Sequence, residues 1–455
     1  MALELISTNP ANNKIIGRYK MHSDSQLNTF VDSADKTFSK WKKTTLNERS
    51  RLLFKLAEVL ENNIEDAKLI TEEMGKPIES AKGEILKCAS LCRFYANNLE
   101  EYLREDKILE GNKNSSIVYC PLGALLGIMP WNFPYWQVIR FAVPAIAAGN
   151  TILLKHASNV SASALQLEKY FKLAGFPDHV YIAILANSEQ MEAVIRNPKI
   201  HGVSLTGSFN AGSSVAKIAG EEVKPSLLEL GGNDAYIILD DADLDLAVRE
   251  GLASRMKNAG QSCIGAKRFV VTEQVYDSFK EKLHQEMKAI QFGDPMDSKT
   301  ILGPLVSVAE RDKLHALVMQ SIEEGASILL GASIPESNGA YYPPTLLEKI
   351  DSSNIAYREE LFGPICVLIK VKDDEEAILV ANDSAFGLGA ALFTQDIKKG
   401  KRLIIESLDA GAVFLNEFVK SDPRIAFGGI KKSGYGREMG EEGLKSFVNK
   451  KYIRY

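Results

Sequence analysis

Three short segments carry side chains whose chemistry could support catalysis. A thiol follows a polar loop in Gly260-Gln261-Ser262-Cys263, and its thiolate could attack an electrophilic carbon. A carboxyl stands among apolar residues and glycines in Glu229-Leu230-Gly231-Gly232-Asn233, where burial would raise its pKa and suit it to general-base work. An amide lies in the rigid frame Pro130-Trp131-Asn132-Phe133-Pro134, from which it could donate a hydrogen bond to an oxyanion.

Each of these groups also has an ordinary structural interpretation. A lone cysteine is more often a small buried residue, Glu229 could be a turn or helix-start carboxylate, and Asn132 could satisfy its own turn backbone. A cysteine hydrolase would need a histidine against the thiol, and the six scattered histidines form no recognisable Cys/His signature. One group alone therefore does not establish a function.

Length and composition describe a globular chain of two or three domains. The chain has 455 residues, of which 45% are hydrophobic and 25% charged, with a formal net charge of −5. These values exclude a disordered chain, a collagen-like chain and a disulfide scaffold. A slightly acidic balance without a dense Lys/Arg block argues against nucleic acid or an anionic membrane as the main partner.

The cysteines and the apolar stretches indicate a cytoplasmic protein without a metal site. Five cysteines are an odd number for a disulfide framework, and only Cys88 and Cys92 have a spacing that zinc could use, with no second ligand pair behind them. The first fourteen residues lack the uninterrupted apolar run of a signal peptide. The most apolar stretch, Leu122 to Gly149, is broken by Asn132, Arg140 and three prolines, so we expect protein interior rather than a membrane helix.

The elements that must position these groups follow an alternating pattern. The N-terminal part looks helical, with Thr45 and Glu48 fitting a capping box and helix-like composition over 78–104. From about residue 124 short apolar runs alternate with helical stretches, which favours a parallel sheet that binds ligands at the carboxyl ends of its strands. The predicted strands of this series are 151–154, 180–185 and 202–205, and its predicted helices are 161–174, 188–197 and 210–219. A second series begins near Ala235, with predicted strands at 235–239, 269–272, 390–393 and 412–415 and a helix at 276–290.

Taken together, the motifs resemble the aldehyde dehydrogenase superfamily. The matching residues are Asn132, Glu229, Cys263, Glu359-Glu360-Leu361-Phe362-Gly363-Pro364, Phe427-Gly428-Gly429, Lys431, Ser433-Gly434 and Gly436-Arg437-Glu438. They fall in the family's order and extend over nearly the whole chain. The resemblance implies an α/β fold with two parallel-sheet domains and a small β oligomerisation arm. The implied divisions are a cofactor-binding domain at 1–102 and 122–230, a catalytic domain at 231–435, and the arm at 103–121 and 436–455.

The resemblance also implies a reaction, the oxidation of an aldehyde to an acid with a nicotinamide cofactor. The Cys263 thiolate would attack the aldehyde carbon, and the Asn132 amide and the Cys263 N–H would hold the oxyanion. After hydride transfer, Glu229 would activate the water that hydrolyses the thioester. CoA-acylating relatives typically lack this glutamate, so its presence favours a free acid as product. A non-enzymatic binding protein of the same fold is a remote alternative.

Several residues match the family's cofactor site. They are Trp131, Lys155, Ser158, Gly207, Ser208, Gly212, Glu360 and Phe362. Gly207 to Gly212 follows a predicted strand and opens a helix, where backbone amides can face a pyrophosphate. NAD-preferring members usually carry Glu where this chain has Ser158, and Ser removes the repulsion of a 2′-phosphate while Lys155 supplies positive charge. We therefore expect NADP to be preferred, with NAD use left open.

The predicted substrate site contains Trp136, Arg140 and Ser421. Arg140 lies eight residues after Asn132, so on one helix it would stand about two turns above it and could bind a carboxylate at the substrate's far end. Succinate-semialdehyde dehydrogenases resemble the chain at Arg140 and Ser421, although they often carry an additional Arg where Lys257 stands. Glutarate semialdehyde or a broad range of aliphatic or aromatic aldehydes are the alternatives, and Arg140 could instead be a structural ion-pair partner.

Two departures from the family pattern concern the proton route from Glu229. Many members have Lys where Phe141 stands and Glu where Asn449 stands, which suggests another route in this chain. No cysteine neighbours Cys263, so no vicinal disulfide switch is expected. The family is usually dimeric or tetrameric, and the strand-like segments 116–120 and 450–455 agree with a homodimer or homotetramer.

Overall fold

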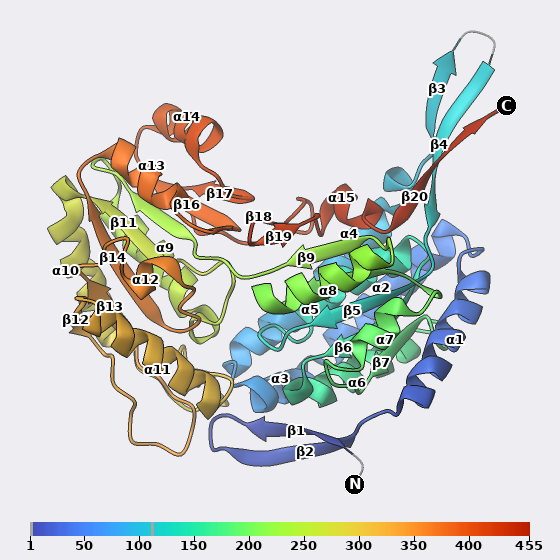
Figure 1. Ribbon diagram of the computed structural model, residues 1–455, viewed down its shortest axis with the longest axis horizontal. Helices are drawn as coiled ribbons and strands as arrows, with labels where there is room; N and C mark the ends of the chain where they lie inside the picture. The colour runs from blue at the N-terminus through green and yellow to red at the C-terminus, as the bar shows by residue number, and fades with distance from the viewer. Residues whose placement is uncertain (1–2, 111–112) are drawn as a thin grey trace.

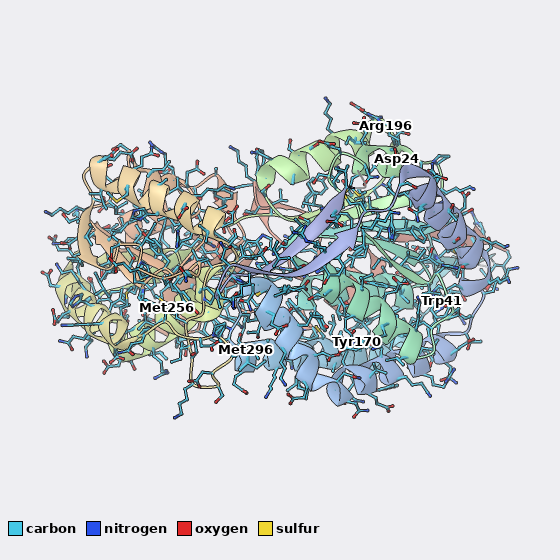
Figure 2. The ribbon with its side chains drawn as sticks, turned by 90° about the horizontal axis from the view of Figure 1, so that it is seen from below. Asp24, Trp41, Tyr170, Arg196, Met256 and Met296 are labelled. Atoms are coloured by element: carbon cyan, nitrogen blue, oxygen red, sulfur yellow. The ribbon has the colours of Figure 1, made fainter. Side chains whose placement is uncertain are left out.

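The molecule has two halves, each built on one large sheet (Figure 1). The computed structural model describes residues 3–110 and 113–455. Residues 1–2 of the predicted cofactor-binding domain and 111–112 of the predicted arm therefore lie outside the described residues. Buried apolar side chains form separate clusters in the two halves, and Figure 2 shows Trp41 and Tyr170 in one half and Met256 in the other.

The first half is organised around a six-stranded sheet with the order β19-β9-β8-β5-β6-β7. Its strands are β5 (Ala124–Met129), β6 (Thr151–His156), β7 (Tyr181–Ile184), β8 (Ile200–Thr206), β9 (Ser226–Glu229) and β19 (Gly434–Tyr435). All neighbouring strands run parallel except the edge pair β19 and β9. The predicted parallel series is confirmed, with β5 added at its centre.

Helices cover both faces of this sheet (Figure 1). They are α1 (Asp24–Trp41), α2 (Leu46–Asn62), η1 (Ile64–Asp66), α3 (Ala67–Met74), α4 (Ile78–Tyr102), α5 (Trp136–Ala147), η2 (Ser158–Val160), α6 (Ser161–Leu173), α7 (Met191–Arg196) and α8 (Phe209–Glu221). Thr45 caps α2 by accepting from the Glu48 N–H at 3.1 Å, whereas the complete reciprocal capping box is at Ser23 and Gln26, ahead of α1.

Helix α5 begins later than the sequence spacing suggested. Its first residue is Trp136, so Asn132 lies in the turn before it, and the expectation that Arg140 stands two turns above Asn132 on one helix is wrong. Every residue of α5 is buried, including Arg140 and the internal Pro144, because the helix runs between the sheet and α4. The stretch from Leu122 to Gly149 is thus protein interior, as predicted.

The second half contains a seven-stranded sheet with the order β12-β13-β14-β11-β10-β16-β17. Its strands are β10 (Ala235–Ile238), β11 (Arg268–Thr272), β12 (Ser327–Leu330), β13 (Thr345–Glu348), β14 (Ile365–Val371), β16 (Gly389–Phe393) and β17 (Ala412–Leu415). Only the edge pair β12 and β13 is antiparallel. The accompanying helices are α9 (Leu244–Met256), η3 (Lys257–Gly260), α10 (Glu273–Ala289), α11 (Val308–Glu323), α12 (Ile355–Arg358), α13 (Asp374–Asn382) and α14 (Ile397–Ser407).

Smaller β elements complete the molecule. An antiparallel three-stranded sheet of β3 (Asp106–Glu110), β4 (Lys113–Pro121) and β20 (Val448–Arg454) projects from the body and carries the C-terminus (Figure 1). Helix α15 (Gly440–Lys445), which precedes β20, packs against α5 instead. The hairpin of β1 (Glu4–Asn9) and β2 (Lys14–Lys20) has no counterpart in the sequence prediction, and β15 (Phe386–Gly387) pairs with β18 (Ile430–Lys431).

All five cysteines are free, and Cys88 and Cys92 are fully buried in α4. Within residues 3–110 and 113–455, no helix combines the length and apolar character needed to cross a bilayer. The same part of the chain holds no group of three or more His, Cys, Asp or Glu side chains that could share a metal ion.

Candidate active site

Cys263 lies in a tightly constrained loop at the boundary between the two halves. The loop leaves α9 through η3, where Asn258 and Ala259 have positive φ values of 55° and 53°. Gly260 follows at φ +74°, and a Cβ there would collide with the Gly363 carbonyl. The buried Arg255 guanidinium donates to the Gly260 carbonyl at 3.0 Å and so holds the loop in this conformation.

The predicted oxyanion donor, Asn132, is held against the same loop. Its Nδ2 donates to the Gln261 carbonyl at 3.2 Å, and its own carbonyl accepts from Asn258 Nδ2 at 2.7 Å. The Asn132 side chain is buried, and its Oδ1 has no hydrogen-bond partner among the described residues. The amide is therefore fixed in one orientation beside the turn that carries the thiol.

Glu229 ends β9 and is buried with both carboxyl oxygens unpaired within the described residues. Arg140 Nη2 lies 4.0 Å from Glu229 Oε2, and Arg140 Nε forms a close ion pair with Glu438. Burial raises the pKa of Glu229, with a further upward effect from Glu438 and an opposing effect from Arg140. The pKa of Glu438 is also raised by burial. Two carboxyls thus share one guanidinium at the predicted base.

Glu438 was missed as a member of this site. The sequence contained Glu438 only as part of a C-terminal motif, with no sign that it would reach Arg140. Asn449 lies in β20 and pairs with Cys120 of β4, within the predicted arm. The suggestion of another proton route from Glu229 stays a prediction. Phe141 is buried and packs edge-on against Phe447, with ring centroids 5.8 Å apart.

The thiol itself is protonated at neutral pH in this environment. Burial raises the pKa of Cys263 to about 12, against the opposing effects of Arg140 and Lys267. Lys267 Nζ donates to the Cys263 carbonyl at 2.6 Å and forms an ion pair with Glu360 Oε1 at 3.1 Å. Lys267, which no sequence motif singled out, therefore joins the cysteine loop to a predicted cofactor residue.

The predicted cofactor residues form two groups, one beside the cysteine loop and one after strands β6 and β8. Beside the cysteine loop, the Trp131 and Phe362 rings meet edge-on with centroids 5.9 Å apart, and Glu360 packs where Gly231 lacks a side chain. At the far group, Ser158 follows β6 and is exposed, while Lys155 near the end of β6 is partly buried. Ser208 caps α8 by accepting from the Ala211 N–H at 3.3 Å.

These residues fit a dinucleotide with an additional 2′-phosphate. β6 and β8 both flank β5, so the segments after them emerge at the same sheet edge. Gly207 lacks a side chain, and an added Cβ would meet only Leu205 at 3.5 Å, which leaves room beside the exposed start of α8. Gly212 is needed for a different reason, because a Cβ there would lie 2.6 Å from Leu230.

A cavity of about 320 Å³ leads to Cys263. Its lining residues are Ser80, Gly83, Glu84, Lys87, Phe133, Trp136, Gln137, Arg140, Ser254, Lys257, Ser262, Cys263, Ile264, Phe418, Val419, Lys420, Ser421 and Phe427. The predicted substrate residues Trp136, Arg140 and Ser421 are all present in this lining. Four of its side chains are cationic, whereas Glu84 is its only carboxylate.

This fold and this arrangement of Cys, Asn and Glu define an aldehyde dehydrogenase. The chain belongs to the aldehyde dehydrogenase family, whose pattern matches residues 3–453. It is 43% identical over 452 residues to a Synechocystis sp. protein named as a probable NADP⁺ succinate-semialdehyde dehydrogenase, covering 99% of both chains. It is 41% identical over 449 residues to an NAD(P)⁺ succinate semialdehyde dehydrogenase of Escherichia coli K12, covering 98% of this chain and 97% of that one.

The fold of the chain also matches that of a solved structure. The succinic semialdehyde dehydrogenase of Streptococcus pyogenes, in complex with NADP⁺, superposes with a TM-score of 0.97 at 35% sequence identity. The match covers 99% of each chain. The predicted fold class, an α/β molecule of the aldehyde dehydrogenase type, is therefore confirmed.

Proposed function

We propose that this aldehyde dehydrogenase oxidises succinate semialdehyde to succinate with NADP⁺. The observation that carries the proposal is the charge of the cavity that leads to Cys263. Lys87, Arg140, Lys257 and Lys420 all line it, against one carboxylate. Such a cavity suits an aldehyde with an anionic far end, because the cations attract a carboxylate in a space largely removed from water. Relatives named for this substrate support the assignment.

The first half of the reaction uses Cys263 and Asn132. The Cys263 sulfur attacks the aldehyde carbon as its proton passes to solvent water, and the oxyanion that forms accepts hydrogen bonds from the Asn132 amide and the Cys263 N–H. When bound, NADP⁺ supplies the acceptor for the hydride that leaves this carbon. Cys263 then carries a thioester, and the clamped loop keeps its carbonyl facing the same donors.

The second half uses Glu229. As an ionised base it removes a proton from water, whose oxygen attacks the thioester carbon, and the acid leaves as the Cys263 sulfur is released. The raised pKa of Glu229 makes it a stronger proton acceptor than an exposed carboxylate. Arg140 lies 4.0 Å from the Glu229 carboxyl and forms an ion pair with Glu438. These two side chains provide the polar groups near the proton that Glu229 takes from water.

The cofactor choice rests on Ser158 and Lys155. Ser158 has no charge to repel a 2′-phosphate, and Lys155, three residues before it near the end of β6, provides a cation. The Streptococcus pyogenes relative was crystallised with NADP⁺, and the Escherichia coli relative is named for NAD(P)⁺, so NAD is retained as a second cofactor. Ser158→Glu is expected to raise the KM for NADP⁺ about tenfold or more while affecting that for NAD⁺ much less.

The test of the whole proposal is nicotinamide reduction by the purified protein. Succinate semialdehyde, glutarate semialdehyde and an uncharged aldehyde such as butanal are each paired with NADP⁺ and with NAD⁺. A clear preference for succinate semialdehyde with NADP⁺ is expected. If kcat/KM for butanal equals that for succinate semialdehyde, the protein is a broad-range aldehyde dehydrogenase. If glutarate semialdehyde is preferred, it is a glutarate-semialdehyde dehydrogenase.

We further propose a homo-oligomeric, cytoplasmic enzyme. The projecting sheet of β3, β4 and β20 has unpaired edges, which seek a partner strand. Five free cysteines suit a reducing compartment. Light scattering on the eluting protein is expected to give the mass of a dimer or tetramer, and a monomer would contradict this part.

A further inference from the structure

Three cations in or behind the wall of the substrate cavity already have a carboxylate partner. Arg140 is engaged by Glu438, and Lys420 forms a close ion pair with Glu417. Lys76, which lies just behind the cavity wall over the Phe133 ring, is paired with Glu84. These cations have their charge balanced within the protein itself.

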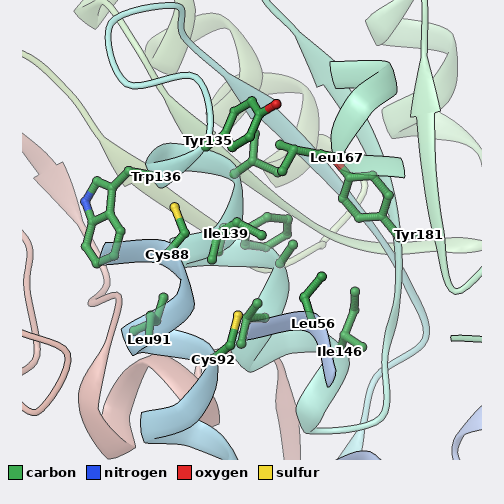
Figure 3. Close-up of a cluster of buried hydrophobic side chains, with 14 of the residues drawn as sticks. Leu56, Cys88, Leu91, Cys92, Tyr135, Trp136, Ile139, Ile146, Leu167 and Tyr181 are labelled. Atoms are coloured by element: carbon green, nitrogen blue, oxygen red, sulfur yellow. The ribbon is translucent and has the colours of Figure 1, made fainter. Parts of the chain in front are cut away.

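Lys87 and Lys257 are different, because both line the cavity and, among the residues that the structure describes, neither forms an ion pair with a carboxylate. Lys87 projects into the cavity from α4. Its ammonium donates to Ser421 Oγ at 2.5 Å and lies 4.0 Å from the centroid of the Trp136 ring. Figure 3 shows Trp136 at the edge of the buried apolar cluster, beside Cys88 from the next position on α4.

The two carboxylates that interact electrostatically with Lys87, Glu84 and Asp422, are already engaged by other groups. Glu84 accepts the backbone N–H groups of Tyr135 and Trp136, at 2.8 and 2.9 Å, in addition to its pairing with Lys76. Asp422 is bound by Arg424 at 2.6 Å. A partly buried ammonium that lacks a counter-ion is costly, so an arriving carboxylate would restore the balance.

We propose that Lys87 binds the far carboxylate of the substrate, in concert with Ser421, and determines specificity for semialdehyde acids. The inference rests on the proposed function and names a residue that the sequence motifs did not include. The Trp136 ring and the Ser421 hydroxyl both contact the ammonium and so orient it. A carboxylate that replaces or joins Ser421 at the ammonium gains a charge-assisted hydrogen bond, which an uncharged aldehyde lacks.

The surroundings of Lys87 also give this contact a pH dependence. The charged and titratable groups around it are Glu84 and Cys88 on α4, Arg140 on α5, Lys257 in η3, and Lys420 and Asp422 in the segment after β17. Burial, followed by the cations Lys257 and Arg140, lowers the pKa of Lys87 to about 7. The free ammonium is thus lost as pH rises through about 7, and carboxylate binding restores it with uptake of a proton.

The experiment compares Lys87→Met, Lys87→Arg and a matched control, Lys82→Met, which removes a lysine from the same helix outside the cavity lining. Each variant and the wild type are assayed with succinate semialdehyde and with butanal at saturating NADP⁺. Lys87→Met is expected to raise the KM for succinate semialdehyde about 10- to 100-fold, with kcat and both butanal constants little changed. Lys87→Arg is expected to recover much of the loss, and Lys82→Met to resemble the wild type.

The outcomes separate the two proposals. A wild type that does not prefer succinate semialdehyde overturns the proposed function, whatever Lys87 does. A wild type with that preference, and a Lys87→Met variant that keeps it or loses both substrates equally, overturns the role of Lys87. The wild type alone gives a second readout. Its KM for succinate semialdehyde should rise between about pH 6.5 and 8.5, a range that includes the pKa of about 7 of Lys87, whereas its KM for butanal should not. If the KM for succinate semialdehyde does not change with pH, the role of Lys87 is contradicted even if the variants fail to fold.

Discussion

Two parts of the molecule that meet at Arg140 carry opposite excesses of charge. The inner part is a buried cluster outside the cavity lining, and it contains the carboxyls Glu229 and Glu438, which share the Arg140 guanidinium. The outer part is the cavity itself, and it contains the ammonium groups of Lys87 and Lys257, which form no ion pair within the described residues. Low exposure acts on both parts, but it raises the pKa values of the inner acids and lowers those of the outer bases.

The difference teaches how two adjoining desolvated regions support two tasks. Inside, a carboxyl with a raised pKa can take a proton from water at neutral pH and hold it more tightly than an exposed group. In the outer part, a cation without a counter-ion is available to bind the carboxylate of the substrate. Arg140 lies at the boundary and contacts the acids while also lining the substrate space. Mutations on the two sides should therefore affect different kinetic constants.

The largest effect is expected on the inner side from Glu229→Gln. The amide cannot remove a proton from water, so thioester hydrolysis should slow about 100-fold or more while hydride transfer persists in part. Pre-steady-state mixing should show a burst of nicotinamide reduction followed by a slow phase. Intact-mass analysis should then find an acyl group on the protein, which Cys263→Ala would remove. Normal steady-state turnover would disprove the role of Glu229 as base.

Arg140→Ala should affect both the buried carboxyls and the substrate cavity, and so tests the boundary between the inner and outer parts. It removes the cation that lowers the pKa of Glu229, so the rate with butanal should fall at neutral pH and recover partly as pH rises. It should also raise the KM for succinate semialdehyde about tenfold or more. Two uncompensated buried carboxyls should destabilise the fold by about 3–5 kcal/mol, as measured by chemical denaturation.

Arg140→Lys keeps a positive charge and serves as the control for this variant. It should lose less stability and less butanal activity than Arg140→Ala. If both variants change only the KM for succinate semialdehyde, Arg140 acts in the substrate cavity alone and does not affect the buried carboxyls.

Much of the fold and the reacting groups could be predicted because their signals are local. Apolar runs such as Thr151–Leu154 followed by helical stretches revealed the parallel sheet, and β6 extends this run by only two residues. The segments around Cys263, Asn132 and Glu229 could be identified from their own neighbours in sequence. The clamps on them, such as Arg255 and Lys267, were not visible, because each acts across a turn on backbone carbonyls.

The charge balance of the cavity could not be predicted because it depends on long-range contacts. Lys87 and Ser421 are 334 positions apart and meet only when α4 packs beside the segment after β17. Arg140 and Glu438 likewise pair across most of the chain. Spacing on one presumed helix also failed for Asn132 and Arg140, because α5 begins only at Trp136.

The smallest effect is expected from Glu438→Gln, which keeps the size of the side chain and removes its charge. Glu438 raises the pKa of Glu229 and occupies Arg140, so its loss should lower that pKa. The ionised base then persists to lower pH, and the acidic limb of the hydrolysis rate should move to lower pH, with the plateau changed less than about tenfold. Glu442→Gln, an exposed carboxyl of α15, is the control. If the acidic limb of the pH profile does not shift, Glu438 only anchors Arg140 and does not change the pKa of Glu229.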